Sequence, residues 1–463
     1  MYPLGNIPAL RTSSRVRVSG HMESKTLRPR RVLIIGAGFG GIACAKALSK
    51  NDKFTVTLVE RTNHHLFQPL LYQVATSSLA APDIACSVRQ VFRDSNNVTV
   101  LMDEILELGT ETKTAVGASG DSYPWDYLVL ATGAKTSFFG HPEWEEHTLG
   151  LKSLADAQGI RRQVLSSLEK AERTTDPVER KRLMTVAIVG GGPTGVELSG
   201  AFVDLVHRSM KGEFRRIDSS DLRVILIEAA DRLLTPYDED QSAYAKERLE
   251  TLGVEVWTER MVRDVGPAYL EFTDGAKLEA STIIWAAGIE ANPLAGKLGV
   301  EPADRSGRIT PERDLSVPGH PDVFIIGDLV RMNDMDDKPV PGVAPAAVQM
   351  GDHVAKVLKE ELRLEKTRYE EKKHELRPGF RYFDKGLMAI IGKNAAVVKS
   401  GKLRLRGFLA WIAWLFIHIL FLIGFRNKLV VLLGWGFAYI RNNPGVRVIV
   451  NPPADAPPQG NSR

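Results

Sequence analysis

The chain has 463 residues, of which 44% are hydrophobic and 25% are charged, and its formal net charge is +4. That length predicts two or three domains, because one hydrophobic core rarely organises so many residues. The small net charge argues against a nucleic-acid partner, and the two cysteines are too few for a disulfide framework, a Cys-x-x-Cys redox centre or a cysteine zinc site, so no metal is expected.

Residues 1–30 are expected to form a disordered N-terminal extension. They are rich in arginine and interrupted by proline and glycine, and they lack the apolar segment of a secretory signal. A true start at Met22, shortly before the first predicted strand, is the favoured explanation. An organellar transit peptide is the alternative.

The first ordered segment combines a short apolar strand with a glycine-rich turn. The strand, residues 32–35, precedes the pattern Gly36-x-Gly38-x-x-Gly41 and a helical pattern. Glycines at these positions allow a tight turn, the close approach of a pyrophosphate and the packing of the helix on the strand. The next predicted strand ends in Glu60, where a carboxylate accepts hydrogen bonds from a ribose diol. The segment therefore predicts a dinucleotide-binding unit.

The same pattern occurs a second time, 154 residues further along the chain. It reads Gly190-x-Gly192-x-x-Gly195, and the strand that follows ends in Glu228. Two dinucleotides on one polypeptide indicate electron transfer between them, usually from a nicotinamide to a flavin. Glu228 favours NADH over NADPH, because a carboxylate at that position repels a 2′-phosphate.

Two further signals resemble those of flavoproteins that bind two dinucleotides. Thr132 and Gly133 follow one buried strand, and Asp328 follows another. In that class, the second signal brings an aspartate to the ribityl chain of FAD, which makes the FAD domain discontinuous. The resemblance implies an α/β fold with two Rossmann-like domains of the glutathione-reductase type and a C-terminal helical region. Its expected divisions are an FAD-binding domain in two parts (31–150 and 300–375), an NADH-binding domain (151–299), C-terminal strands with membrane-anchoring helices (376–450) and a disordered tail (451–463).

Three stretches narrow the choice of reductase. HHLFQPLLYQVA (64–75), FRYFDKGLMAIIGK (380–393) and the apolar region 407–440 together resemble the type II NADH:quinone oxidoreductases, over roughly residues 31–445. Disulfide reductases and sulfide:quinone reductases of the same class need cysteines that this chain lacks. The resemblance implies that NADH reduces a bound FAD, which then reduces a membrane quinone without proton pumping.

The resemblance also assigns the candidate site residues. Glu197 is expected near the nicotinamide and the flavin, while Gln349 and Lys385 are expected at the quinone. Pro345 stands where the family has a first glutamine, which leaves the preferred quinone open. The helix dipole alone also explains an acid at Glu197, and Lys385 is open to being a solvated charge. The expected cofactor residues are Gly36, Gly38, Gly41, Glu60, Arg61, Thr132, Gly133 and Asp328 for FAD, and Gly190, Gly192, Gly195, Glu228, Ala287 and Gly288 for NADH.

The run from 407 to 425 is apolar throughout, and its length is enough for one transmembrane helix. However, Trp411, Trp414 and His418 lie inside the run on one helical face, and cations flank it on both sides. Two helices lying on the membrane surface are therefore favoured over one span. The expected location is the cytoplasmic face of the cell membrane, as a peripheral protein and a possible homodimer.

Two rival functions stay open on the residues alone. One is an NADH-dependent reductase of a soluble electron carrier, which leaves residues 407–440 without a purpose. The other is an NADH-sensing flavoprotein of the apoptosis-inducing-factor type, in which the C-terminus is a docking surface.

Overall fold

The computed structural model describes residues 28–365, 370–441 and 446–449. Most of the expected N-terminal extension and the whole expected tail, 451–463, lie outside the described residues.

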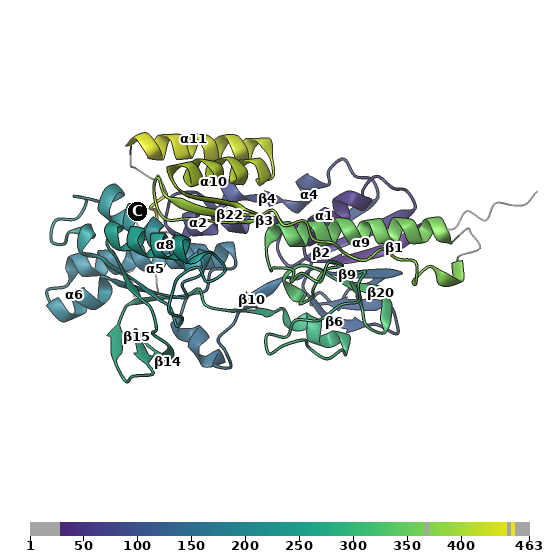
Figure 1. Cartoon of the computed structure of the whole chain (residues 1–463), viewed down its shortest axis with the longest axis horizontal. Coiled ribbons are helices and arrows are strands. Elements are labelled where there is room, and N and C mark those ends of the chain that lie inside the picture. The colour runs from purple at the N-terminus through teal and green to yellow at the C-terminus, as the bar shows by residue number, and fades with distance from the viewer. Residues whose placement is uncertain (1–27, 366–369, 442–445, 450–463) are drawn as a thin grey trace, which may run out of the picture.

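The first unit is a six-stranded sheet in the order β19-β20-β9-β1-β2-β5. Its neighbouring strands are parallel except for the β19–β20 pair. Helices α1 and α9 pack against each other on one side of the sheet (Figure 1). These elements are β1 (Arg30–Ile35), α1 (Phe39–Leu48), β2 (Phe54–Glu60), β5 (Val98–Met102), β9 (Tyr127–Leu130), β19 (Ser316–Val317), β20 (His320–Ile325) and α9 (Ala344–Leu364).

The second unit is a four-stranded parallel sheet in the order β13-β12-β11-β17. All five residues of β11, one of the two inner strands, are buried, as expected for a parallel strand covered on both faces. The unit contains α5 (Leu154–Arg173), α6 (Pro177–Leu183), β11 (Thr185–Val189), α7 (Pro193–Asp204), β12 (Arg223–Ile227), α8 (Glu239–Leu252), β13 (Val254–Trp257) and β17 (Thr282–Trp285).

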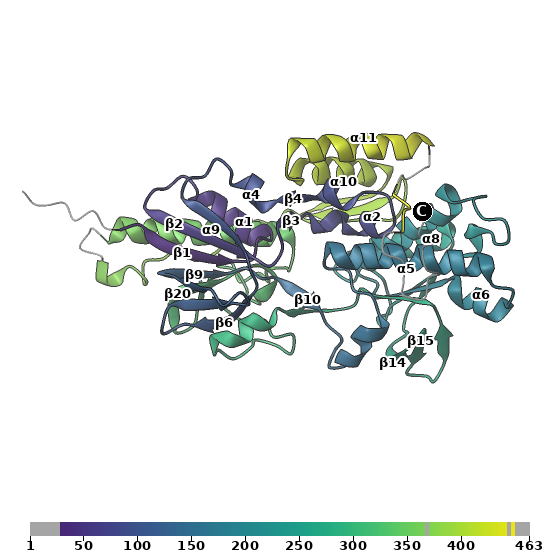
Figure 2. The same ribbon diagram turned by 180° about the vertical axis from the view of Figure 1, so that it is seen from behind.

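The chain passes from the first unit to the second and then returns. The antiparallel pair β10 and β18 joins the two units (Figure 2), and β20 then takes its place beside β9 in the first sheet. Smaller elements complete the two units: β3 (His64–Leu66), α2 (Leu71–Ala75), α3 (Ala81–Ile84), β4 (Ala85–Ser87), α4 (Val88–Val91), β6 (Ile105–Gly109), β7 (Thr114–Gly117), β8 (Ser122–Pro124), β10 (Ala134–Thr136), β14 (Val262–Gly266), β15 (Tyr269–Phe272), β16 (Lys277–Glu279) and β18 (Ile289–Ala291). The predicted α/β class with two Rossmann-like units is confirmed.

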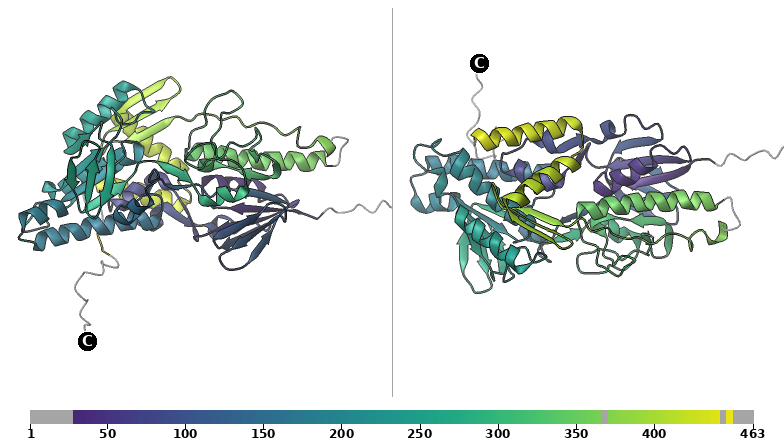
Figure 3. Two further views of the ribbon diagram at one scale, coloured as in Figure 1. Left: turned by 90° about the horizontal axis from the view of Figure 1, so that it is seen from below. Right: turned by 45° about the horizontal axis from the view of Figure 1, so that its top comes forward.

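A C-terminal layer covers one side of the molecule. It consists of the antiparallel strands β21 (Leu387–Ile390), β22 (Ala396–Ser400) and β23 (Leu403–Gly407), followed by α10 (Phe408–Phe421) and α11 (Phe425–Arg441). Both helices lie on the outer face of this layer (Figure 3). In the described part of the chain, no helix has both the length and the apolar content that crossing a membrane requires.

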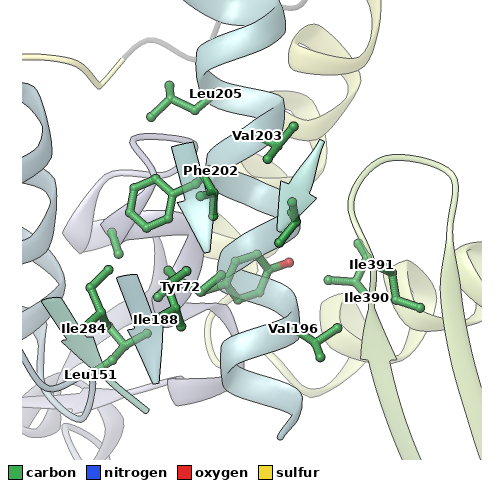
Figure 4. Packing of buried hydrophobic residues seen from close by; sticks show 14 of the residues in the cluster. Tyr72, Leu151, Ile188, Val196, Phe202, Val203, Leu205, Ile284, Ile390 and Ile391 are labelled. Atoms are coloured by element: carbon green, nitrogen blue, oxygen red, sulfur yellow. The ribbon is translucent and has the colours of Figure 1, made fainter. Parts of the chain in front are cut away.

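The C-terminal layer shares a hydrophobic core with the second unit. Phe202 and Val196 of α7 pack beside Tyr72 of α2, whose hydroxyl group points toward Ile390 and Ile391 of the layer (Figure 4). The same core includes buried residues of α10. The layer is therefore packed into the body of the protein.

Candidate active site

A cavity of about 1000 Å³ is lined by residues of both units. The first unit contributes the glycine turn between β1 and α1, and the second contributes Thr194 and Glu197 from the start of α7. Loops that follow β9 and β20 complete the wall. The carboxyl ends of neighbouring parallel strands meet here, which is where open α/β sheets bind their ligands.

The first glycine turn has the geometry that a phosphate group needs. Gly36 has a φ of +103°, and a Cβ atom there would lie 2.4 Å from the carbonyl oxygen of Ala131. At Gly38 the only neighbour within 4 Å of a Cβ is that same oxygen, at 4.0 Å. The backbone at Gly38 therefore borders open space at the N-terminus of α1, where free N–H groups favour an anion.

The carboxylate of Glu60 lies beside the first glycine turn, where two backbone N–H groups hold it. Its Oε2 accepts a hydrogen bond from the backbone N of Ala37 at 2.7 Å, and Oε1 accepts one from the N of Thr62 at 3.1 Å. Oε1 also accepts from the hydroxyl group of Thr62 at 3.2 Å, so Oε2 is the oxygen that keeps a lone pair for a ribose diol. Arg61 lines the same end of the cavity and is exposed.

Thr132, Gly133 and Asp328 also line the cavity. The hydroxyl group of Thr132 is buried and has no hydrogen-bond partner among the described residues. A buried polar atom without a partner is costly, so this hydroxyl fits a site where a ligand supplies the partner. The residues around the first turn are thus suited to a bound dinucleotide.

The second glycine turn repeats this geometry. Gly190 has a φ of +114°, and a Cβ at Gly192 would meet nothing within 4 Å. Glu228 accepts hydrogen bonds from the backbone N of Gly191 at 2.6 Å and of Ala230 at 2.8 Å. The second turn therefore offers open backbone beside a fixed carboxylate, as the first does.

A phenylalanine that the sequence analysis did not single out covers the loop expected to meet the nicotinamide. Gly288 follows Ala287 in this loop and has a φ of +74°, and a Cβ there would lie 2.5 Å from the ring of Phe139. Phe139 itself has a φ of +53° and its ring centroid lies 6.5 Å from that of Trp285. Only the three-dimensional pairing of β10 with β18 brings residues so far apart in sequence together, so no local signal could have found Phe139.

Glu197 lines the cavity from α7 and is in contact with the C-terminal layer. Its Oε1 accepts a hydrogen bond from the backbone N of Ile390 at 3.4 Å. Burial raises the pKa of Glu197 to about 8, while the hydrogen bond from the backbone N of Ile390 acts in the opposite direction. Burial, together with the charge of Glu197, also raises the pKa of Tyr72. The carboxyl group is therefore mostly protonated at neutral pH, which suits a group that gives and takes a proton.

Gln349 and Lys385 lie outside the lining of this cavity. The Gln349 amide is hydrogen-bonded to the backbone of Phe383, with its Nε2 donating at 3.0 Å and its Oε1 accepting at 2.9 Å. The ammonium group of Lys385 lies 4.9 Å from the centroid of the Phe421 ring in α10. The structure therefore brings Glu197 to the cavity wall, whereas Gln349 lies on α9 beside Phe383 and Lys385 lies against α10.

Comparison with known proteins gives a consistent result. The sequence profile of the family called pyridine nucleotide-disulphide oxidoreductase matches residues 30–351. The chain is 39% identical over 439 residues to a protein of Mycobacterium tuberculosis named type II NADH:quinone oxidoreductase Ndh, which covers 93% of this chain and 92% of that protein. It is 26% identical over 452 residues to the external NADH-ubiquinone oxidoreductase 2 of Saccharomyces cerevisiae mitochondria, with coverages of 89% and 81%. The structure of NDH2 from Plasmodium falciparum in complex with NADH is similar in fold, with a TM-score of 0.81 and 22% identity over 91% of this chain and 100% of that chain.

Proposed function

The chain belongs to the pyridine nucleotide-disulphide oxidoreductase family and, within it, to the type II NADH:quinone oxidoreductases, and we propose that it oxidises NADH and reduces a membrane quinone by means of a bound FAD. The observation that carries this proposal is the cavity lined by residues of both units, with Glu197 in its wall. The bound flavin would supply the chemistry of accepting two electrons from NADH and passing them to the quinone.

We assign the flavin nucleotide to the first unit. Gly36, Gly38 and Gly41 give its phosphates access to the N-terminus of α1, and Glu60 with Arg61 holds the adenosine end. Thr132, Gly133 and Asp328 face its middle part, which the unpartnered hydroxyl of Thr132 supports.

We assign NADH to the second unit, around Gly190, Gly192, Gly195 and Glu228. The fixed Glu228 carboxylate accepts hydrogen bonds from the ribose and repels a 2′-phosphate. Ala287 and Gly288 receive the nicotinamide once the Phe139 side chain moves away from Gly288. These assignments imply the division into an FAD-binding domain (31–150 and 300–375) and an NADH-binding domain (151–299).

Glu197 exchanges a proton in this scheme. A carboxyl group with a pKa of about 8 can release a proton and take it back at neutral pH without a large cost in either direction. Its position in the cavity wall, in contact with the C-terminal layer, places this proton between the cofactor cavity and the side of the molecule that carries α10 and α11.

We further propose that the protein is peripheral and lies on the cytoplasmic face of the cell membrane, with residues 407–440 in contact with the lipid. Large apolar side chains of α10 and α11 are exposed, and exposed apolar patches mark interaction surfaces. They are Phe408, Leu409, Ile412, Phe416, Leu420, Phe421, Phe425, Leu429, Leu432, Leu433, Phe437 and Ile440. Gln349 and Lys385 stay our candidates for the quinone site, because Lys385 contacts Phe421 of this surface.

Steady-state assays of the detergent-purified, flavin-loaded protein test the proposal. NADH should reduce ubiquinone or menaquinone analogues with rapid turnover. Rapid turnover with a soluble protein carrier and none with quinones would favour the soluble-carrier reductase. Very slow turnover with every acceptor, together with tight NADH binding, would favour the NADH-sensing flavoprotein.

A further inference from the structure

Lys152 places a basic side chain in the wall of the central cavity. Its backbone is held at both polar groups: its N donates to Oδ2 of Asp156 at 2.9 Å, and its carbonyl oxygen accepts from Nε2 of Gln68 at 3.2 Å. Three residues earlier, Leu149 is joined to β17 by two backbone hydrogen bonds of 2.9 Å. The position of the lysine in the wall is therefore fixed by both units.

The ammonium group of Lys152 differs from the other cations of the cavity. Lys135 is paired with Glu290 at 3.0 Å, and Arg61 is exposed at the adenosine end. Among the described residues, Lys152 has no side-chain hydrogen bond or ion pair. Burial lowers the pKa of Lys152, and the charge of Asp328 opposes this effect. A half-buried cation without a partner is unfavourable, so the geometry calls for an anionic group that arrives with the ligand.

The place of Lys152 in the cavity indicates which part of the ligand supplies that anion. We assign the phosphates of FAD to the turn at Gly38. Lys152 instead lies near Asp328, and the backbone close to it is hydrogen-bonded to the second unit. The proposed ribityl site at Asp328 leads on to the flavin ring. Reduction of a flavin by two electrons with uptake of one proton at N5 leaves a negative charge shared by N1 and the C2 oxygen.

We infer that Lys152 is the cationic group that stabilises the negative charge of the reduced flavin ring in this protein, an inference that rests on the proposed binding of FAD. Lys152 therefore binds the reduced ring more tightly than the oxidised ring. That difference raises the reduction potential of the bound flavin, which helps it to accept electrons from NADH.

The flavin-loaded Lys152→Met protein tests this inference without NADH or quinone. Its midpoint potential is measured by anaerobic reductive titration against a reference dye, and its flavin content by absorbance after release. We expect the ratio of the binding constants for reduced and oxidised flavin to fall at least tenfold, which lowers the potential of a two-electron couple by about 30 mV. Lys152→Arg, which keeps the charge, should retain most of the wild-type potential.

Lys135→Met is the matched control, because it removes one positive charge from the same cavity at a residue that already has a partner. It should change the potential much less than Lys152→Met does. An unchanged potential in flavin-loaded Lys152→Met overturns the inference. So does loss of flavin with an unchanged potential of the remainder, since that result assigns Lys152 to the phosphates or the ribityl chain.

The wild-type protein offers a second measurement, which does not depend on whether the variant folds. If the ring stays anionic on reduction, one proton enters with two electrons, and the potential falls by about 30 mV per pH unit. That slope should persist below pH 7, where reduced flavin in water takes up a second proton. A slope of about 60 mV per pH unit from pH 6 to 7 contradicts the inference. Wild-type protein that binds no flavin at all would instead overturn the proposed function.

Discussion

At the scale of single residues, the protonation of Glu197 makes stability depend on pH. The pKa of this carboxyl group is about 8 in the folded protein, against an ordinary value of 4.5. Because the folded-state pKa is raised, the neutral acid favours folding below pH 4.5, and this stability is lost as the pH rises through 8. Each pKa unit corresponds to about 1.4 kcal/mol. The side chain of Glu197→Gln cannot ionise. Between pH 6 and pH 9, the free energy of unfolding of this variant should therefore fall by on the order of 1–3 kcal/mol less than that of the wild type.

Denaturant unfolding of both proteins at pH 6 and pH 9, with flavin content matched, measures this difference. The control is Glu250→Gln, which changes an exposed glutamate of α8 and should follow the wild type at both pH values. Equal losses in wild type and Glu197→Gln would show that Glu197 is already ionised at pH 6.

Glu228 gives a second prediction at this scale, on the choice of nucleotide. Its carboxylate is fixed by the backbone N–H groups of Gly191 and Ala230, so it cannot turn away from a 2′-phosphate. NADH should be preferred over NADPH by at least about tenfold in kcat/KM, which corresponds to roughly 1.4 kcal/mol. Glu228→Gln keeps one acceptor for the backbone and should narrow the preference severalfold. Equal efficiency of the two nucleotides with the wild-type enzyme would refute the assignment of Glu228 to the ribose.

At the scale of elements, a substitution in one of the two glycine turns should abolish the binding of one nucleotide and leave the binding of the other unchanged. A Cβ at Gly38 or at Gly192 meets no atom closer than 4.0 Å, so a valine at either turn projects into the space assigned to a ligand. Gly38→Val should purify without flavin. Gly192→Val should keep its flavin but lose at least about 100-fold in the rate of flavin reduction by NADH, equivalent to about 2.7 kcal/mol.

Absorbance of the purified proteins and rapid mixing with NADH distinguish the two variants. Circular dichroism checks that both are folded. The opposite pair of phenotypes would mean that the two nucleotide sites are exchanged.

Local pattern was sufficient to predict these two units but not how side chains from different elements meet. The turns at Gly36 and Gly190 were found because the chemistry of a glycine turn is written in a few adjacent residues. Phe139 lies over Gly288 only because β10 pairs with β18, and the position of Lys152 depends on contacts with both units. The contact of Glu197 with β21 is likewise a tertiary effect, so its raised pKa has no signal in the sequence.

At the scale of the whole molecule, the C-terminal helices have an inner face and an outer face with different tasks. Trp414 of α10 is fully buried, with its ring centroid 3.9 Å from that of His418, and Trp435 of α11 donates a hydrogen bond to Oε1 of Gln73 at 2.7 Å. The indole of Trp414 also contacts Glu197. Removal of both helices would therefore open the core and alter the cofactor cavity. A test of membrane binding has to change the outer face alone.

The double substitution Phe416→Glu with Leu433→Glu makes that change, since these side chains are 67% and 63% exposed on α10 and α11. Each apolar side chain buried in lipid contributes roughly 1.5–3 kcal/mol, so the loss of both should weaken binding to anionic vesicles by at least about 100-fold in co-sedimentation. Flavin content and NADH oxidation by ferricyanide should stay near wild type, whereas turnover of a long-chain quinone in liposomes should collapse. Val178→Glu, at a 67% exposed apolar residue of α6 on the second unit, is the matched control and should bind vesicles normally. High salt should also weaken the binding of the wild-type protein to anionic vesicles. Arg426 and Lys428 beside this face contribute about 1 kcal/mol each to binding at an anionic surface. Undiminished vesicle binding by the double variant would exclude the outer face of α10 and α11 as the surface that meets the membrane.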